Sequence, residues 1–198
     1  MQQYTGTLGK VTSVGSGLLI IGAALVDAGE LARQPVLEQI GHVFSALAAL
    51  GLICLPYGLR ASGVGDDSRW LPMGTGALLL GLGFALLIEL PPIFDPADLS
   101  MGHTFGPLGL VLLSTGFLAW FAAIHESKRL GGWRKWVFFL AGMWLLLIFP
   151  IIQLPLFVIS HARPSFLLVT GVLGAMTFLI GTIIQRRAAQ AARETAQG

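Results

Sequence analysis

The amino-acid sequence predicts an all-α integral membrane protein with six transmembrane helices. Three observations lead to this fold class: the composition, the lengths of the apolar segments and the distribution of basic residues between them. The chain has 198 residues, of which 55% are hydrophobic and 11% are charged, and its mean hydropathy is +0.78. These proportions lie far outside the range of a water-soluble domain of this length. The solvent of most of the chain is therefore expected to be a lipid bilayer.

Six apolar segments are long enough to cross a bilayer, which takes about 20 mostly apolar residues in a helix. Each segment is continuously apolar and lacks the alternation of a membrane β-strand, so all six are predicted to be helices. The predicted spans are residues 11–28, 40–59, 71–94, 105–124, 133–160 and 166–184.

These spans are expected to form three helical hairpins within a single transmembrane domain, residues 1–198. The first hairpin covers residues 11–60, with a connection of roughly ten residues between Glu30 and Gln39. The second covers residues 71–126, and its connection runs from Asp95 to Gly102.

The third hairpin covers residues 133–187 and is followed by a polar tail, residues 188–198, predicted to be cytoplasmic. Pro150 and Pro155 flank Gln153 in its first helix, and each proline removes a backbone hydrogen bond. A kink or local unwinding is therefore expected there.

A weak internal repeat relates the first two hairpins. Aligning the glycine-bounded segment that starts at Gly17 with the one that starts at Gly76 sets Glu30 opposite Glu89. Farther along, Gly-His-Val-Phe from residue 41 matches Gly-His-Thr-Phe from residue 102, so His42 and His103 hold equivalent positions. Small residues such as Gly102 and Gly106 are predicted to be helix-packing surfaces.

The charge distribution predicts the orientation, because cytoplasmic loops carry the excess of Lys and Arg. Threading six helices leaves only Arg33 and Arg163 on the other side, which instead carries most of the acidic residues and three histidines. Both termini are therefore predicted to be cytoplasmic. The basic residues on the cytoplasmic side are Lys10, Arg60, Arg69, Lys128, Arg129, Arg134, Lys135, Arg186, Arg187 and Arg193.

One group of residues near the outer leaflet has the chemistry of a binding site, since ionisable groups within spanning segments are costly and mark sites by default. His42 and His103 begin the second and fourth predicted helices on the same side, and two facing imidazoles could hold a single b-type haem. Alternatively, histidine nitrogens and carboxylate oxygens suit a divalent metal or a proton site. The further candidates for such a metal site are Asp27, Glu30, Glu89 and His161. The alternative without a cofactor is that these carboxylates extend to the lipid headgroups or cap neighbouring loops.

A basic patch at the cytoplasmic interface is predicted to meet anionic lipid headgroups. It consists of Lys128, Arg129, Arg134 and Lys135. The sequence contains no phosphate-binding loop, dinucleotide fingerprint, nucleophile elbow or helical zinc-protease motif, so enzymatic activity and nucleic-acid binding are not expected.

The glycine-rich hairpins, the Gly-His-x-Phe motif and the basic link Lys-Arg-Leu-Gly-Gly-Trp, residues 128–133, together resemble a broad group of small six-helix bacterial membrane proteins. The resemblance implies a six-helix bundle in the bacterial cytoplasmic membrane. It transfers no functional residues, because no activity is assigned to that group.

The function favoured by these observations is that of a non-enzymatic accessory or structural subunit, bound to lipids and to other subunits of a larger membrane complex. The alternative is an outer-leaflet cofactor or ion site, built from His42, His103 and nearby carboxylates, in electron transfer or transport.

Overall fold

The computed structural model describes residues 2–65, 68–95, 98, 100–148, 151 and 165–197 of the chain, apart from the side chains of residues 2, 3, 103, 148 and 195–197. Within these residues the structure is helical and contains no strand. The elements are α1 (Gln2–Ala32), α2 (Pro35–Leu52), α3 (Cys54–Ala61), α4 (Leu71–Phe94), α5 (Ser100–Ser127), the short 3-10 helix η1 (Gly132–Lys135), α6 (Trp136–Ile148), the π-helical segment η3 (Leu167–Gly171) and α8 (Val172–Gln197).

Five helices in the described part of the chain are long and apolar enough to cross a membrane, so the chain is a helical membrane protein. The predicted fifth span, residues 133–160, is described only through η1, α6 and residue 151. Its remaining residues, with Pro150, Gln153 and Pro155, lie outside the described part. The five spans are Tyr4–Ala32, Pro35–Ala61, Leu71–Phe94, Thr104–Ser127 and Leu167–Glu194.

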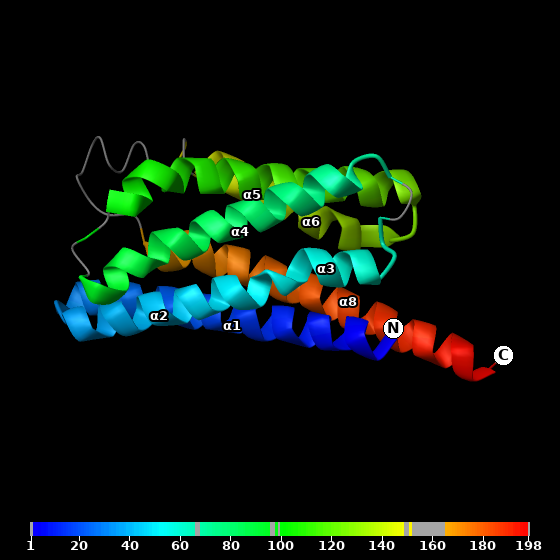
Figure 1. Cartoon of the computed structure of the whole chain (residues 1–198), viewed down its shortest axis with the longest axis horizontal. Helices are drawn as coiled ribbons and strands as arrows, with labels where there is room; N and C mark the ends of the chain where they lie inside the picture. The colour runs from blue at the N-terminus through cyan, green and yellow to red at the C-terminus, as the bar shows by residue number, and fades with distance from the viewer. Residues whose placement is uncertain are drawn as a thin grey trace.

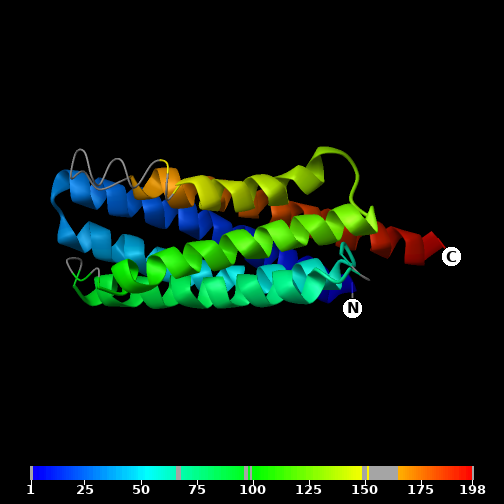
Figure 2. The same cartoon turned by 90° about the horizontal axis from the view of Figure 1, so that it is seen from above.

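The helices lie side by side in an elongated bundle (Figure 1). Helix α1 packs against α2 and α8, α4 packs against α5, and α5 packs against α6. Helix α4 runs obliquely, from beside α5 at its start to beside α2 at its end, and so joins the two halves of the bundle. Figure 2 shows the same arrangement from above, with α4 and α5 next to each other.

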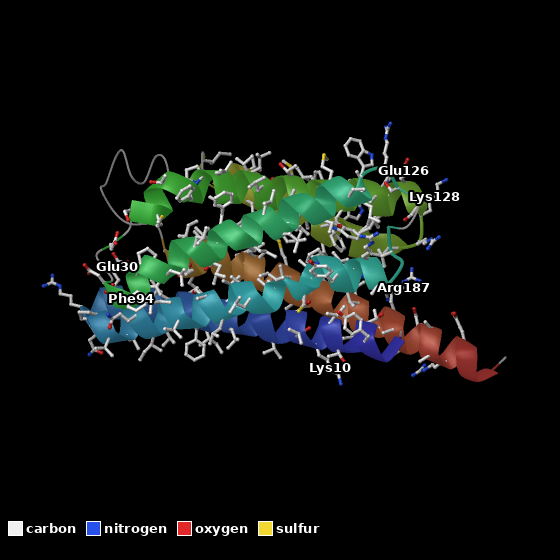
Figure 3. All side chains as sticks on the ribbon, viewed as in Figure 1. Lys10, Glu30, Phe94, Glu126, Lys128 and Arg187 are labelled. Atoms are coloured by element: carbon white, nitrogen blue, oxygen red, sulfur yellow. The ribbon has the colours of Figure 1, made fainter. Side chains whose placement is uncertain are left out.

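The two ends of the bundle differ in charge, as the sequence predicts. Glu30 and Phe94 lie at one end, here called the acidic end, whereas Lys128 and Arg187 lie at the other, here called the basic end (Figure 3). At the acidic end, hydrogen bonds from the side chain and backbone of Ser100 lower the pKa of the exposed Asp98 carboxyl.

The connection between α1 and α2 is much shorter than the ten residues predicted. Arg33 adopts a left-handed backbone conformation with φ of 55°, which ends α1, and Pro35 then begins α2. Only Arg33 and Gln34 separate the two helices. Residues 29–32 and 35–39, which lie outside the apolar spans predicted from hydropathy, are helical in the structure.

A second local feature interrupts the second span. Pro56 has no backbone N–H and its ring crowds the carbonyl of Leu52, four residues earlier. The helix breaks at Ile53 in consequence, and α3 continues the same predicted span beyond the break.

Glycines set the closest helix contacts, as expected where van der Waals packing replaces the hydrophobic drive. A Cβ atom placed on Gly22 of α1 would lie 2.8 Å from the carbonyl oxygen of Gly41 in α2. Gly9 of α1 meets Gly181 of α8 in the same way, with a distance of 3.0 Å between the added Cβ atom and the carbonyl oxygen. These contacts hold α2 and α8 on the two sides of α1.

Candidate functional site

A histidine and a glutamate from different helices meet inside the bundle near its acidic end. Nδ1 of His42 in α2 lies 2.7 Å from Oε2 of Glu89 in α4, a hydrogen-bonding distance. Both residues are buried, with 7% of His42 and 8% of Glu89 exposed. Buried ionisable groups in membrane helices are costly unless paired, and the pair satisfies each of them.

A neighbouring contact aligns the two helices for this pairing. The side-chain amide of Gln39 donates a hydrogen bond to the carbonyl oxygen of Phe94, the last residue of α4, at 3.2 Å. Gln39 and His42 are three residues apart and share one face of α2. One turn farther into the bundle, His42 therefore meets Glu89, which precedes the end of α4 by five residues.

A partly open cavity of about 280 Å³, here called the central cavity, lies next to this pair. Side chains from α1, α2, α4, α5, α6 and the last helix all contribute to its wall. The lining is apolar or glycine except for Ser45, Glu89 and Thr170, and Glu89 is its one ionisable side chain among the described residues. The carboxyl group is thus the principal polar feature of an otherwise apolar chamber.

The wall that α5 contributes is made largely of glycine. Gly102, Gly106 and Gly109 recur every three or four residues, so they lie on one face of the helix and line the cavity. A Cβ atom on Gly106 would meet no atom within 4 Å, and one on Gly102 would touch only Ile88, at 3.7 Å. The prediction that Gly102 and Gly106 form a tight packing surface is therefore wrong, because this face of α5 leaves a space instead of closing it.

The last helix begins with an irregular segment at the same cavity. Residues Leu167–Gly171 form a π-helix, a rare geometry that often occurs at functional sites. Trp144 of α6 donates its indole N–H to the carbonyl oxygen of Val169 within this segment, at 3.3 Å. Phe166 lines the cavity and meets the ring of His42 edge-on, with 6.0 Å between centroids.

Asp27 of α1 fixes the start of this last helix. Its Oδ1 accepts a hydrogen bond from the backbone N–H of Phe166 at 2.7 Å, and its Oδ2 accepts one from the N–H of Leu167 at 3.0 Å. The hydroxyl of Ser165 donates to the same Oδ2 atom. A carboxylate from another helix thus takes the place of an N-cap residue.

We expect Asp27→Ala to lower the free energy of unfolding by about 1 to 2 kcal/mol, because two backbone N–H groups at the start of the last helix lose their acceptor. Detergent-induced unfolding in mixed micelles measures the change, and hydrogen exchange at the amides of Phe166 and Leu167 should accelerate. Asp27→Asn, which keeps one acceptor oxygen, is the matched control and should lose less. Unchanged protection of these amides in Asp27→Ala would show that the cap is unimportant.

The other predicted site residues are placed only in part. Glu30 is exposed at the acidic end. The side chain of His103 and the whole of His161 lie outside the described residues. In the part that is described, no three His, Cys, Asp or Glu side chains are grouped to hold a metal ion. The haem between His42 and His103, and the metal site with Asp27, Glu30, Glu89 and His161, stay predictions.

The predicted lipid-interface residues gather around the end of α5 and the start of α6. Arg129 donates from Nη1 to the carbonyl oxygen of Gly63 at 3.0 Å. Nζ of Lys135 lies 3.4 Å from Nδ1 of His125 and 5.9 Å from the centre of the Trp136 ring. Lys128 is exposed and Arg134 is half-buried. Their contact with anionic lipid stays a prediction.

The fold and the site define a helical membrane protein with a paired histidine and glutamate beside an internal apolar cavity. No protein-family model, curated protein or solved structure matches this chain.

Proposed function

We propose that this membrane protein binds a small lipophilic molecule in the central cavity, with the Glu89–His42 pair as the polar contact. The observation that carries the proposal is the lining of the cavity, which is apolar around a single buried carboxyl group held by a histidine of another helix. Ligand sites are typically concave, apolar and equipped with a few convergent polar groups. An ionisable residue inside the membrane supports the same interpretation.

The volume supports a ligand of modest size. A cavity of 150 Å³ in a soluble protein accommodates benzene, and the cavity beside Glu89 is nearly twice as large, at about 280 Å³. It therefore suits a molecule of roughly ten to fifteen non-hydrogen atoms.

An occupant would also offset the cost of the empty space. The apolar side chains that border unfilled space lack neighbours for dispersion contacts. The bundle could reduce that cost by larger side chains on α5, yet it carries Gly102 and Gly106 at positions with room for them. Glycine at these positions is expected if a ligand occupies the space.

The test uses a neutral probe, 1-adamantanol, whose cage has ten carbon atoms. In a non-ionic detergent we expect it to raise the unfolding temperature of the wild-type protein in a concentration-dependent way, because a ligand of the folded state stabilises that state. Gly106→Leu should abolish the effect by filling the cavity. Gly83→Leu is the matched control, because a Cβ atom on Gly83 also meets nothing within 4 Å but Gly83 is not part of the cavity wall.

Equal stabilisation of the wild type and Gly106→Leu would show that the probe acts elsewhere, and no stabilisation of the wild type would contradict the proposal. Denaturing the purified wild-type protein and analysing the extract by mass spectrometry would then identify any natural occupant.

For the membrane topology we propose six spans in three hairpins, with both termini in the cytoplasm of a bacterium. Two hairpins are supported by the packing of α1 against α2 and of α4 against α5. The grouping of Lys128 and Arg187 at one end of the bundle supports the orientation. The internal repeat belongs to the same proposal, and labelling of single cysteines from either side of the membrane tests the topology.

The accessory-subunit hypothesis also stays a prediction, compatible with a ligand site. It predicts that gentle extraction from native membranes recovers the chain together with other proteins, whereas recovery as a lone monomer would count against it. The haem alternative predicts a Soret band that shifts on reduction and is lost in His42→Ala.

A further inference from the structure

We infer that the ligand of the central cavity is a lipophilic amine in its protonated form, with an apolar body of about ten carbon atoms. This inference rests on the proposed function, since it specifies the ligand class of the same cavity. It has three supports: the charge of the described lining, the acceptor capacity of the Glu89 carboxyl group and the volume of the cavity.

The charge of the lining selects against anions. Among the described residues that line the cavity, no lysine or arginine occurs, and Glu89 is the one ionisable group. A carboxylate or phosphate ligand would find no lysine or arginine partner among these residues, and it would lie against the Glu89 carboxyl group. A cation would instead lie beside a carboxyl group that can supply the opposite charge a buried ion requires.

The geometry of the pair leaves Glu89 able to accept further hydrogen bonds. His42 lies at hydrogen-bonding distance from one carboxyl oxygen, Oε2, through Nδ1. A carboxylate has two oxygens and about four acceptor positions. A ligand ammonium group has several N–H donors, and hydrogen bonds between ionised partners are about twice as strong as neutral ones. The polar group of the ligand is therefore a donor that carries positive charge.

The cavity wall away from Glu89 indicates what the apolar body of the ligand should be. This part of the wall consists of side chains such as Leu82, Leu110 and Phe166, together with the glycine face of α5. In the part of the wall that the structure describes, this surface offers dispersion contacts, the hydroxyl groups of Ser45 and Thr170 and no further charge, so it favours a compact hydrocarbon body.

Three probes with the same ten-carbon cage test the inference: 1-aminoadamantane, 1-adamantanol and 1-adamantanecarboxylate. Each is titrated at pH 7 into the wild-type protein in one non-ionic detergent, with its partition into empty micelles measured separately. The unfolding temperature, followed by tryptophan fluorescence, gives the apparent affinities. We expect the amine to bind about tenfold more tightly than the alcohol and the carboxylate to bind more weakly than both.

Glu89→Gln, which keeps the side-chain volume, should remove the preference for the amine while the alcohol still binds. Gly83→Leu should keep the wild-type order of affinities. If Glu89→Gln fails to fold, the affinities of the three probes for the wild-type protein still test the inference, because that comparison needs no variant.

The outcomes separate the inference from the proposed function. Alcohol binding that equals or exceeds amine binding in the wild type overturns the amine inference and leaves a lipophilic-ligand site standing. Carboxylate binding as tight as amine binding also overturns it. If none of the three probes stabilises the wild type more than Gly106→Leu, both the inference and the proposed function fail.

Discussion

Replacing Glu89 with leucine is expected to lower the free energy of unfolding by about 3 kcal/mol. The substitution leaves His42, which is only 7% exposed, without its partner inside the bundle. A buried polar group that loses its partner costs its full desolvation penalty. Detergent-induced unfolding in mixed micelles, followed by circular dichroism and tryptophan fluorescence, measures the loss.

The double variant Glu89→Leu with His42→Leu should recover most of the stability lost by either single change. Replacing a buried, mutually hydrogen-bonded pair of ionisable side chains with apolar residues of similar volume is often neutral or stabilising. Glu89→Gln should lose less than Glu89→Leu, because its amide oxygen can still accept from Nδ1 of His42. Strictly additive losses in the double variant would mean that the two side chains do not depend on each other for stability.

The second large effect is expected at the crossing of α1 and α2. A Cβ atom on Gly22 would lie 2.7 Å from Oγ of Ser45, 2.8 Å from the carbonyl oxygen of Gly41 and 2.9 Å from the backbone nitrogen of Ser45. Two of these atoms belong to the backbone, so α1 and α2 must separate to admit even a methyl group. We therefore expect Gly22→Ala to lower the free energy of unfolding by about 2 to 3 kcal/mol.

Gly17→Ala is the matched control on the same helix, because its Cβ atom would meet nothing within 4 Å. It should leave stability unchanged or raise it by up to about 1 kcal/mol, since alanine favours a helix over glycine. The same mixed-micelle unfolding assay compares the two variants. Equal stability of Gly22→Ala and Gly17→Ala would show that the close approach of α1 and α2 is not required.

The sequence predicted which residues belong to the candidate site better than it predicted which of them contact each other. His42, Glu89 and Asp27 were all recognised as candidates, because ionisable residues stand out in apolar segments. The repeat, however, only aligned His42 with His103 and Glu30 with Glu89 along the sequence. It gave no sign of the contact between His42 and Glu89 that the structure contains. Asp27, expected as a metal ligand, accepts hydrogen bonds from the start of the last helix.

The cavity is the main feature that sequence reasoning missed. Its wall contains residues from α1, α2, α4, α5, α6 and the last helix. In the sequence, the spacing of Gly102, Gly106 and Gly109 looks the same whether the glycines pack against another helix or line a cavity. A stripe of glycines permits a close approach but does not enforce one. In the structure α4 runs obliquely to α5 (Figure 1), and the glycines of α5 form part of the cavity wall.

The sequence by itself determined that this is a helical membrane protein with an acidic end and a basic end. Span length, hydropathy and the sign of loop charges are local properties, and the bilayer acts on each segment separately. The tertiary structure decided which groups meet, because that depends on how each helix is rotated about its axis and where it crosses its neighbours. These rotations depend on contacts between residues far apart in the chain, such as Gly22 with Gly41, Gln39 with Phe94 and Asp27 with Phe166.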